Sequence, residues 1–188
     1  MVRTFLLAGA LAIAPVAGQQ QQPPPVEFTV EVRGSIADFS IRMDAYAMLR
    51  EEMQQGVPRL KVTDDPKEII RAEEMLAARI RRARSGARRH DIFTQEIRNG
   101  FRKVLRPFAT KAICEQIADD NPGEFGYRVN ATYPRGIPVS TVPAAILAAL
   151  PQLPPDVNYR FLETDLILHD TRANIILDRI DEALDCDD

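Results

Sequence analysis

The first part of the chain shows two different spacings of hydrophobic residues. Residues 26–33 alternate valine or phenylalanine with charged or hydroxyl side chains, which is the period-two pattern of a half-buried strand. From residue 35 to residue 55 the spacing becomes helical, with Phe39, Met43 and Tyr46 on one face and Gly56 at the end. The pattern therefore predicts a short strand followed by an amphipathic helix that contributes to the core.

Two further helices are predicted in the middle of the chain. Asp64 or Asp65 can cap the first of them, because Pro66 then stands at the first helical position, where proline is favoured. Thr94 can cap the next helix, whose apolar residues again recur at helical spacing. Pro107 is expected to kink or divide this helix before a further segment that ends near residue 120.

After residue 126 the pattern changes from helical to extended. A strand is expected at residues 127–133, and a proline-rich loop then leads to a short helix at 144–150. Three more strands are predicted at residues 157–163, 165–169 and 175–180. Turn residues separate them, which favours an antiparallel meander. A C-terminal helix over residues 175–184 is the alternative, because Ile176, Ile180 and Leu184 are spaced by four.

The order of these elements predicts an α+β fold. Amphipathic helices, an αα-hairpin plus a third helix interrupted by proline, are expected over about residues 35–120, and a small antiparallel β-meander over about 126–184. Residues 26–188 would then form a single domain. The composition agrees, since 188 residues with 45% hydrophobic and 27% charged side chains are typical of an ordinary folded domain. It excludes a collagen-like, wholly disordered or polytopic membrane protein.

The N-terminus has the pattern of a secretory signal peptide. Arg3 precedes an apolar run at residues 5–14, and small residues around Gly18 offer a cleavage site, so residues 1–18 are predicted to be removed. The run is about half of the roughly 20 residues that a spanning helix needs, although a retained anchor is the alternative. A tether rich in Gln and Pro follows at 19–25. With no later segment apolar enough to span a bilayer, we expect an exported protein, periplasmic or extracellular.

Export changes the interpretation of the two cysteines. In an oxidising compartment Cys114 and Cys186 could close a long loop, which would stabilise the fold by about 3–4 kcal/mol. The alternatives are a buried Cys114 with a free Cys186 in the acidic tail, or an intermolecular bridge through Cys186. The sequence leaves all three open.

Several short motifs become distinctive when they are taken together. They are Val62-Thr63-Asp64-Asp65-Pro66, Ser85-Gly86-Ala87-Arg88, Asp91-Ile92-Phe93-Thr94, Tyr159-Arg160-Phe161, Asp165-Leu166-Ile167-Leu168 and Ala173-Asn174. In this combination the chain, from about residue 38 to its end, resembles a family of uncharacterised secreted bacterial proteins. The resemblance implies export, a bacterial origin and helices followed by a sheet. It implies no activity, cofactor or catalytic residue.

The chain offers little that indicates catalysis. His90 and His169 are each followed by aspartate, Asp91 and Asp170, and such a pair could supply a general base or metal ligands. Initiation of turns by the aspartates is the simpler interpretation. The sequence contains no nucleophile elbow, zinc-protease motif or phosphate-binding loop, so we predict no catalytic residue, metal site or cofactor. An exported hydrolase that uses a His-Asp pair, or loop carboxylates between residues 133 and 170, is the alternative function.

Charge is distributed very unevenly along the chain. The net charge of −3 conceals −4 over residues 19–78, +9 over 79–111 and −9 over 112–188. The candidate binding residues come from the basic block and are Arg79, Arg81, Arg82, Arg84, Arg88, Arg89, Arg98 and Arg102. On neighbouring helices these arginines could form one cationic surface. The simpler alternative is that they face water or pair with the acidic C-terminal half.

An arginine-rich surface favours phosphate and carboxylate groups, which the planar guanidinium can bind with two hydrogen bonds. The expected partner is an anionic envelope component or an acidic protein. Nucleic acid is not expected, because few aromatic side chains accompany the arginines and export removes the usual target. The leading prediction is thus a non-catalytic, exported interaction domain that uses the arginine surface on an anionic partner.

Overall fold

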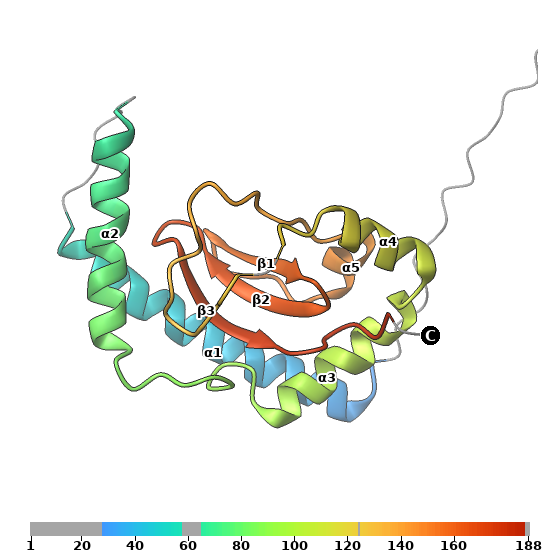
Figure 1. Ribbon diagram of the computed structural model, residues 1–188. Coiled ribbons are helices and arrows are strands. Elements are labelled where there is room, and N and C mark those ends of the chain that lie inside the picture. The colour runs from blue at the N-terminus through green and yellow to red at the C-terminus, as the bar shows by residue number, and fades with distance from the viewer. Residues whose placement is uncertain (1–27, 58–64, 124, 187–188) are drawn as a thin grey trace, which may run out of the picture.

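The computed structural model describes residues 28–57, 65–123 and 125–186, in which helices precede a sheet (Figure 1). The helices are α1 (Val30–Gln55), α2 (Pro66–Ala83), α3 (Gln95–Leu105), α4 (Lys111–Asp119) and α5 (Ala144–Ala149), with a 3-10 turn at Arg106–Phe108. The strands are β1 (Val157–Leu162), β2 (Asp165–Asp170) and β3 (Ile175–Ile180). This order confirms the α+β prediction. The predicted signal peptide at 1–18 and tether at 19–25 lie outside the described residues.

The helix boundaries follow the capping signals in the sequence. Asp65 caps α2 by accepting a hydrogen bond from the Lys67 amide, and Thr94 caps α3 in the same way through the Ile97 amide. Pro107 lies in the 3-10 turn that separates α3 from α4, as its missing amide predicts. No helix in the described ranges combines the length and the apolar character needed to cross a bilayer.

The start of α1 shows that the strand predicted at residues 26–33 is wrong. Thr29 accepts a hydrogen bond from the Val32 amide, so the helix begins at Val30, and Gly34 lies inside it. Val32 is 1% exposed whereas Val30 is 88% exposed, so the alternating valines do not share a buried face. The apolar face of the helix begins one turn earlier than predicted, at Val32. Extending this long helical face determines the local structure more strongly than the short alternating pattern does. Residues 26 and 27 lie outside the described ranges.

The sheet is an antiparallel meander in the order β1-β2-β3, as predicted. The first turn contains Glu163 with φ 53°, and the second contains Asn174 with φ 49°, a backbone conformation that asparagine tolerates well. Because β3 pairs along its length with β2, residues 175–180 form a strand. The alternative of a C-terminal helix there is therefore wrong.

The two faces of the sheet are covered by different parts of the chain. Figure 1 shows α1 and α3 along one face. There the Phe39 ring lies 4.9 Å from that of Phe101 and 5.4 Å from that of Phe93, and the three are fully buried. A smaller cluster on the other face includes Tyr133 and Ile167, against which Phe125 packs. The sheet thus lies between the helices and the loop that precedes α5.

That loop replaces the strand predicted at residues 127–133. It meets the outer edge of β3 through an isolated bridge between Thr132 and Ile175 and through backbone bonds such as that from the Asn130 amide to the Ile176 carbonyl oxygen. Asn130 has φ 64°, and the Ala131 amide donates to the Arg128 carbonyl oxygen, so a turn interrupts the segment. The prediction of a strand at residues 127–133 is wrong because this turn interrupts the extended backbone in the middle of the segment.

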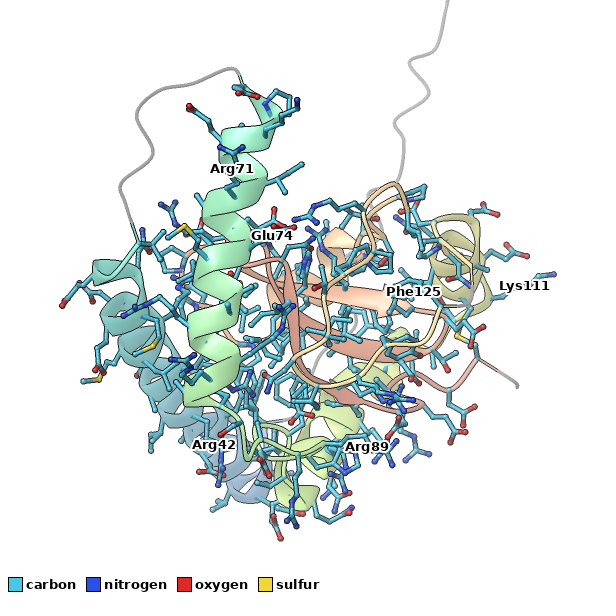
Figure 2. All side chains as sticks on the ribbon, turned by 60° about the vertical axis from the view of Figure 1, so that its left-hand side comes forward. Arg42, Arg71, Glu74, Arg89, Lys111 and Phe125 are labelled. Atoms are coloured by element: carbon cyan, nitrogen blue, oxygen red, sulfur yellow. A yellow bond between two sulfur atoms is a disulfide. The ribbon has the colours of Figure 1, made fainter. Side chains whose placement is uncertain are left out.

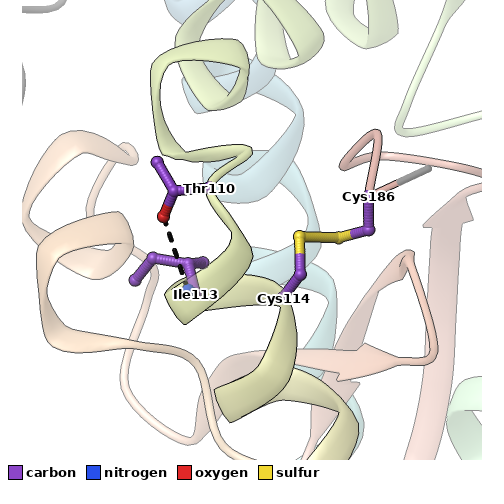
Figure 3. Close-up of a disulfide and its surroundings, with 4 residues drawn as sticks. All are labelled: Thr110, Ile113, Cys114 and Cys186. Atoms are coloured by element: carbon purple, nitrogen blue, oxygen red, sulfur yellow. Dashed lines mark hydrogen bonds between the residues drawn. A yellow bond between two sulfur atoms is a disulfide. The ribbon is translucent and has the colours of Figure 1, made fainter. Parts of the chain in front are cut away.

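A disulfide joins the end of the chain to the helical part. Cys114 on α4 and Cys186 after β3 are bonded, with their Cα atoms 5.8 Å apart (Figure 3). Thr110 caps α4 beside the bridge by accepting from the Ile113 amide. Of the three alternatives that the sequence left open, the structure contains the intramolecular bridge.

Candidate functional site

Most of the arginines predicted to form one cationic surface instead bind backbone carbonyl oxygens. Five of the eight do so: Arg79 to Met53 at 2.7 Å, Arg81 to Asn130 at 2.8 Å, Arg84 to Leu177 at 3.0 Å, Arg98 to Phe93 at 2.9 Å and Arg102 to Asp181 at 2.7 Å. Except for the bond made by Arg98, these bonds connect segments far apart in the sequence. The basic block is therefore largely a set of structural contacts, and the structure does not bring it together as one surface.

Arg84 is the most enclosed member of the set. Its guanidinium carbon lies 5.5 Å from the centre of the Tyr46 ring, and burial lowers the pKa of the group. Beneath it the Tyr46 hydroxyl donates to the fully buried Asp170 carboxylate at 2.5 Å, and Arg50 lies 3.5 Å from the same oxygen. These groups form a buried polar network at the contact between α1 and the sheet, which leaves Arg84 unavailable to a ligand.

Two of the three remaining arginines line a cleft between the loop after α2 and the outer edge of β3. The cleft has a volume of about 340 Å³, and its lining includes Arg88, Arg89, Arg128 and Arg179, which we call the arginine cleft. Figure 2 shows Arg89 projecting from that loop, at the opposite end of the molecule from Arg71 on α2. Arg88 and Arg89 belong to the predicted set, whereas Arg128 and Arg179 do not. Arg82, also predicted, is exposed on α2 and is not part of the cleft lining.

The four guanidinium groups of the arginine cleft differ in what they already bind. Arg179 donates to Asp181 at 2.8 Å and lies 4.7 Å from the centre of the Tyr127 ring. Arg89 approaches the same carboxylate at 3.3 Å. Arg88 and Arg128 are exposed, and within the described part of the chain their side chains have no hydrogen-bond or ion-pair partner. Two guanidinium groups are therefore available to an anion.

A buried carboxylate fixes the turn that presents Arg88 and Arg89. Asp178 on β3 is fully buried, and its two oxygens accept hydrogen bonds from the amides of His90, Ile92 and Phe93 at 2.8, 2.8 and 2.9 Å. A fourth bond comes from the amide of its neighbour Arg179 at 2.9 Å. His90 adopts φ 74°, which lets successive amides of the turn converge on one carboxylate. Both sides of the arginine cleft are thus anchored on Asp178.

The two His-Asp doublets do not form catalytic pairs. His90 faces Asp181 with its Nε2 at 3.2 Å, while Asp91 accepts from the Arg88 amide and shapes the turn. His169 is buried against Tyr133 and bonds Asn174 at 3.0 Å, and burial lowers its pKa so that the neutral ring is favoured. The sequence neighbours therefore serve separate structural contacts.

Two of the loop carboxylates considered for a hydrolase, Asp165 and Asp170, likewise make structural contacts. Asp165 accepts from the Tyr127 hydroxyl and from the Glu182 amide, both at 2.8 Å, and Asp170 belongs to the buried network under Arg84. Glu163 lies in the turn between β1 and β2. Among residues 28–57, 65–123 and 125–186, no three His, Cys, Asp or Glu side chains are grouped closely enough to hold a metal ion.

Comparison with known proteins gives no match: no family model matches the chain, and neither does any curated protein or solved structure. The chemistry of the arginine cleft therefore carries the functional argument.

Proposed function

We propose that this chain is an exported, non-catalytic interaction domain that binds an anionic group of its partner in the arginine cleft. The observation that carries the proposal is that Arg88 and Arg128 both line the cleft, are exposed and have no side-chain partner among the described residues. Guanidinium groups from two segments of the chain can bind the oxygens of one phosphate, sulfate or carboxylate group with charge-assisted hydrogen bonds.

The other two arginines support this function through geometry. The contacts of Arg179 with Asp181 and Tyr127 fix its guanidinium, and the contact of Arg89 with Asp181 restrains the opposite wall. Groups that are already ordered lose little conformational entropy when a ligand binds. The anion would therefore meet a cleft with two fixed and two adaptable cations.

The disulfide supports the export part of the proposal. Disulfides persist in oxidising compartments and are rare in the cytosol, and the Cys114–Cys186 bridge joins α4 to the segment after β3. The leader-like pattern at residues 1–18 points to the same compartments. Together they favour an envelope or extracellular partner that carries acidic groups.

The test is retention on two anionic matrices, heparin and phosphocellulose, measured as the salt concentration at elution. The variant Arg88→Gln/Arg128→Gln should elute at clearly lower salt than the unaltered protein on at least one matrix. Removing two charge-assisted contacts is expected to weaken binding about tenfold or more. Comparison of the two matrices distinguishes sulfate and carboxylate from phosphate ligands.

A control pair separates the cleft from net charge. Arg71 and Arg106 are exposed and lie outside the cleft lining, so Arg71→Gln/Arg106→Gln changes the net charge equally. The control should elute almost unchanged. Equal shifts for both pairs would show that retention follows total charge, and that result would overturn the proposed cleft function.

A further inference from the structure

A second hollow lies between α5 and β1 and shares no lining residue with the arginine cleft. It is a groove of about 510 Å³ whose lining includes Val142, Leu147, Leu150, Leu153 and Val157. Leu147 in its lining is 48% exposed, so its side chain is open to solvent and to a ligand. The exposed Leu147 and the partly buried Leu153 give the groove its open aliphatic surface, whereas Val142, Leu150 and Val157 belong to the core behind it.

One cation, Arg160 on β1, also lines this groove. Its Nη1 donates to the Ser140 carbonyl oxygen at 3.0 Å, but its buried Nε has no hydrogen-bond partner, and no carboxylate of the described chain pairs with it. Burial lowers the pKa of the guanidinium. A half-buried positive charge without an acid is costly, since charges removed from water are normally paired. The groove thus combines an aliphatic wall with an unmatched cation.

The backbone next to the groove narrows the choice of occupant. β1 is an edge strand, and an open edge could accept an added strand from another chain. Here the Phe161 carbonyl oxygen already accepts from the Ser140 hydroxyl, and the Val157 amide donates to the Pro154 carbonyl oxygen. Because the chain itself uses both ends of this edge, a small amphiphile fits better than a continuous added strand.

We infer that this groove binds an aliphatic monocarboxylate, such as a medium-chain fatty acid, with its carboxylate on Arg160 and its tail along Leu147, Leu150 and Leu153. The site is separate from the arginine cleft, and its argument does not rest on the proposed function. A carboxylate in the groove would supply the anionic partner that the Arg160 guanidinium lacks among the described residues, through a charge-assisted hydrogen bond.

The test uses octanoate as the probe, with binding measured by calorimetry and by amide shifts in NMR spectra. Octanoate should bind and shift resonances around Leu147 and Leu153, whereas 1-octanol, which has the same tail length without the charge, should bind more weakly. Arg160→Gln should weaken octanoate binding about tenfold or more. Leu147→Asn changes an exposed side chain, so the fold is expected to persist while affinity falls.

Arg106→Gln is the matched control, because Arg106 is exposed and lies outside the linings of both the groove and the arginine cleft, so octanoate binding should be unchanged. Two results would overturn the inference: no octanoate binding at millimolar concentration, or equal affinity of the Arg160→Gln variant. A third result would also overturn the inference. If the protein forms a dimer that Leu147→Asn disrupts and octanoate does not, the groove is the contact surface for a second copy of the chain.

Discussion

Replacement of Asp178 by asparagine should disturb both the stability of the fold and the shape of the arginine cleft. The carboxylate is fully buried, and both of its oxygens accept backbone amides. Asparagine has nearly the same shape but only one oxygen, so its NH₂ group would face two amide hydrogens in place of accepting them. The change therefore removes the one oxygen that accepts two amide hydrogen bonds, without creating a cavity.

The expected loss of stability follows from the number of amides left without an acceptor. A buried donor that loses its partner costs about 1–3 kcal/mol, so two such donors cost about 2–6 kcal/mol. That is a large part of the total stability of about 5–15 kcal/mol that is typical of a domain. If the asparagine oxygen keeps Oδ1's place, the amides of Ile92 and Phe93 are the two affected donors, because both bind Oδ2.

Urea denaturation gives the free energy of unfolding, and hydrogen exchange locates the damage. Amide exchange at Ile92 and Phe93 should accelerate more than exchange in α1. Asp156→Asn is the control, because Asp156 is exposed and its turn conformation, with φ 63°, is one that asparagine tolerates. A loss below about 0.5 kcal/mol for Asp178→Asn, the size of an ordinary surface change, would refute the reasoning.

Three further changes have expected outcomes. Cys114→Ser/Cys186→Ser should lower the unfolding free energy by about 4 kcal/mol, since the bridge closes a 72-residue loop; an unchanged melting temperature would contradict this. Gly100→Ala should destabilise by about 1–3 kcal/mol, because the added Cβ would lie 2.6 Å from the Ser35 Cβ, whereas Gly34→Ala meets no atom within 4 Å and should not. Burial lowers the pKa of His169, so the unfolded chain binds more protons and stability should fall as pH drops below about 6.5; His169→Gln should flatten urea midpoints between about pH 7 and 5.5.

The sequence predicted those elements whose signals are local. Asp65 and Thr94 cap their helices, Pro107 separates α3 from α4, and Asn174 takes the positive φ in its turn, because each depends only on neighbouring residues. The two wrong strands depended on wider context. At Val30 a helix begins where alternation suggested a strand, and at Asn130 a turn bends the chain although the flanking residues favour extended structure.

The candidate site was predictable only in part, because half of it comes from residues distant in sequence. Arg88 and Arg89 stand out in the basic block, but Arg128 and Arg179 are isolated in an acidic half of the chain. The placement of these two beside the loop after α2 depends on the bonds of Asp178 and on the contact of Asn130 with Ile176. A count of charge along the chain cannot detect a cluster that tertiary contacts assemble.

The arginines also show why a run of like charge is a weak indicator of a binding surface. A guanidinium has five donors on a long side chain, so it can reach a carbonyl oxygen on another segment and satisfy it, as Arg81, Arg84 and Arg102 do. Such an arginine contributes charge to the sequence but few free donors to the surface. What distinguishes Arg88 and Arg128 is therefore their lack of an internal acceptor and not their membership of a basic block. Arg160 on β1 differs from them, because its Nη1 donates to the Ser140 carbonyl oxygen, but it likewise has no carboxylate partner among the described residues, although it lies in the acidic half of the chain.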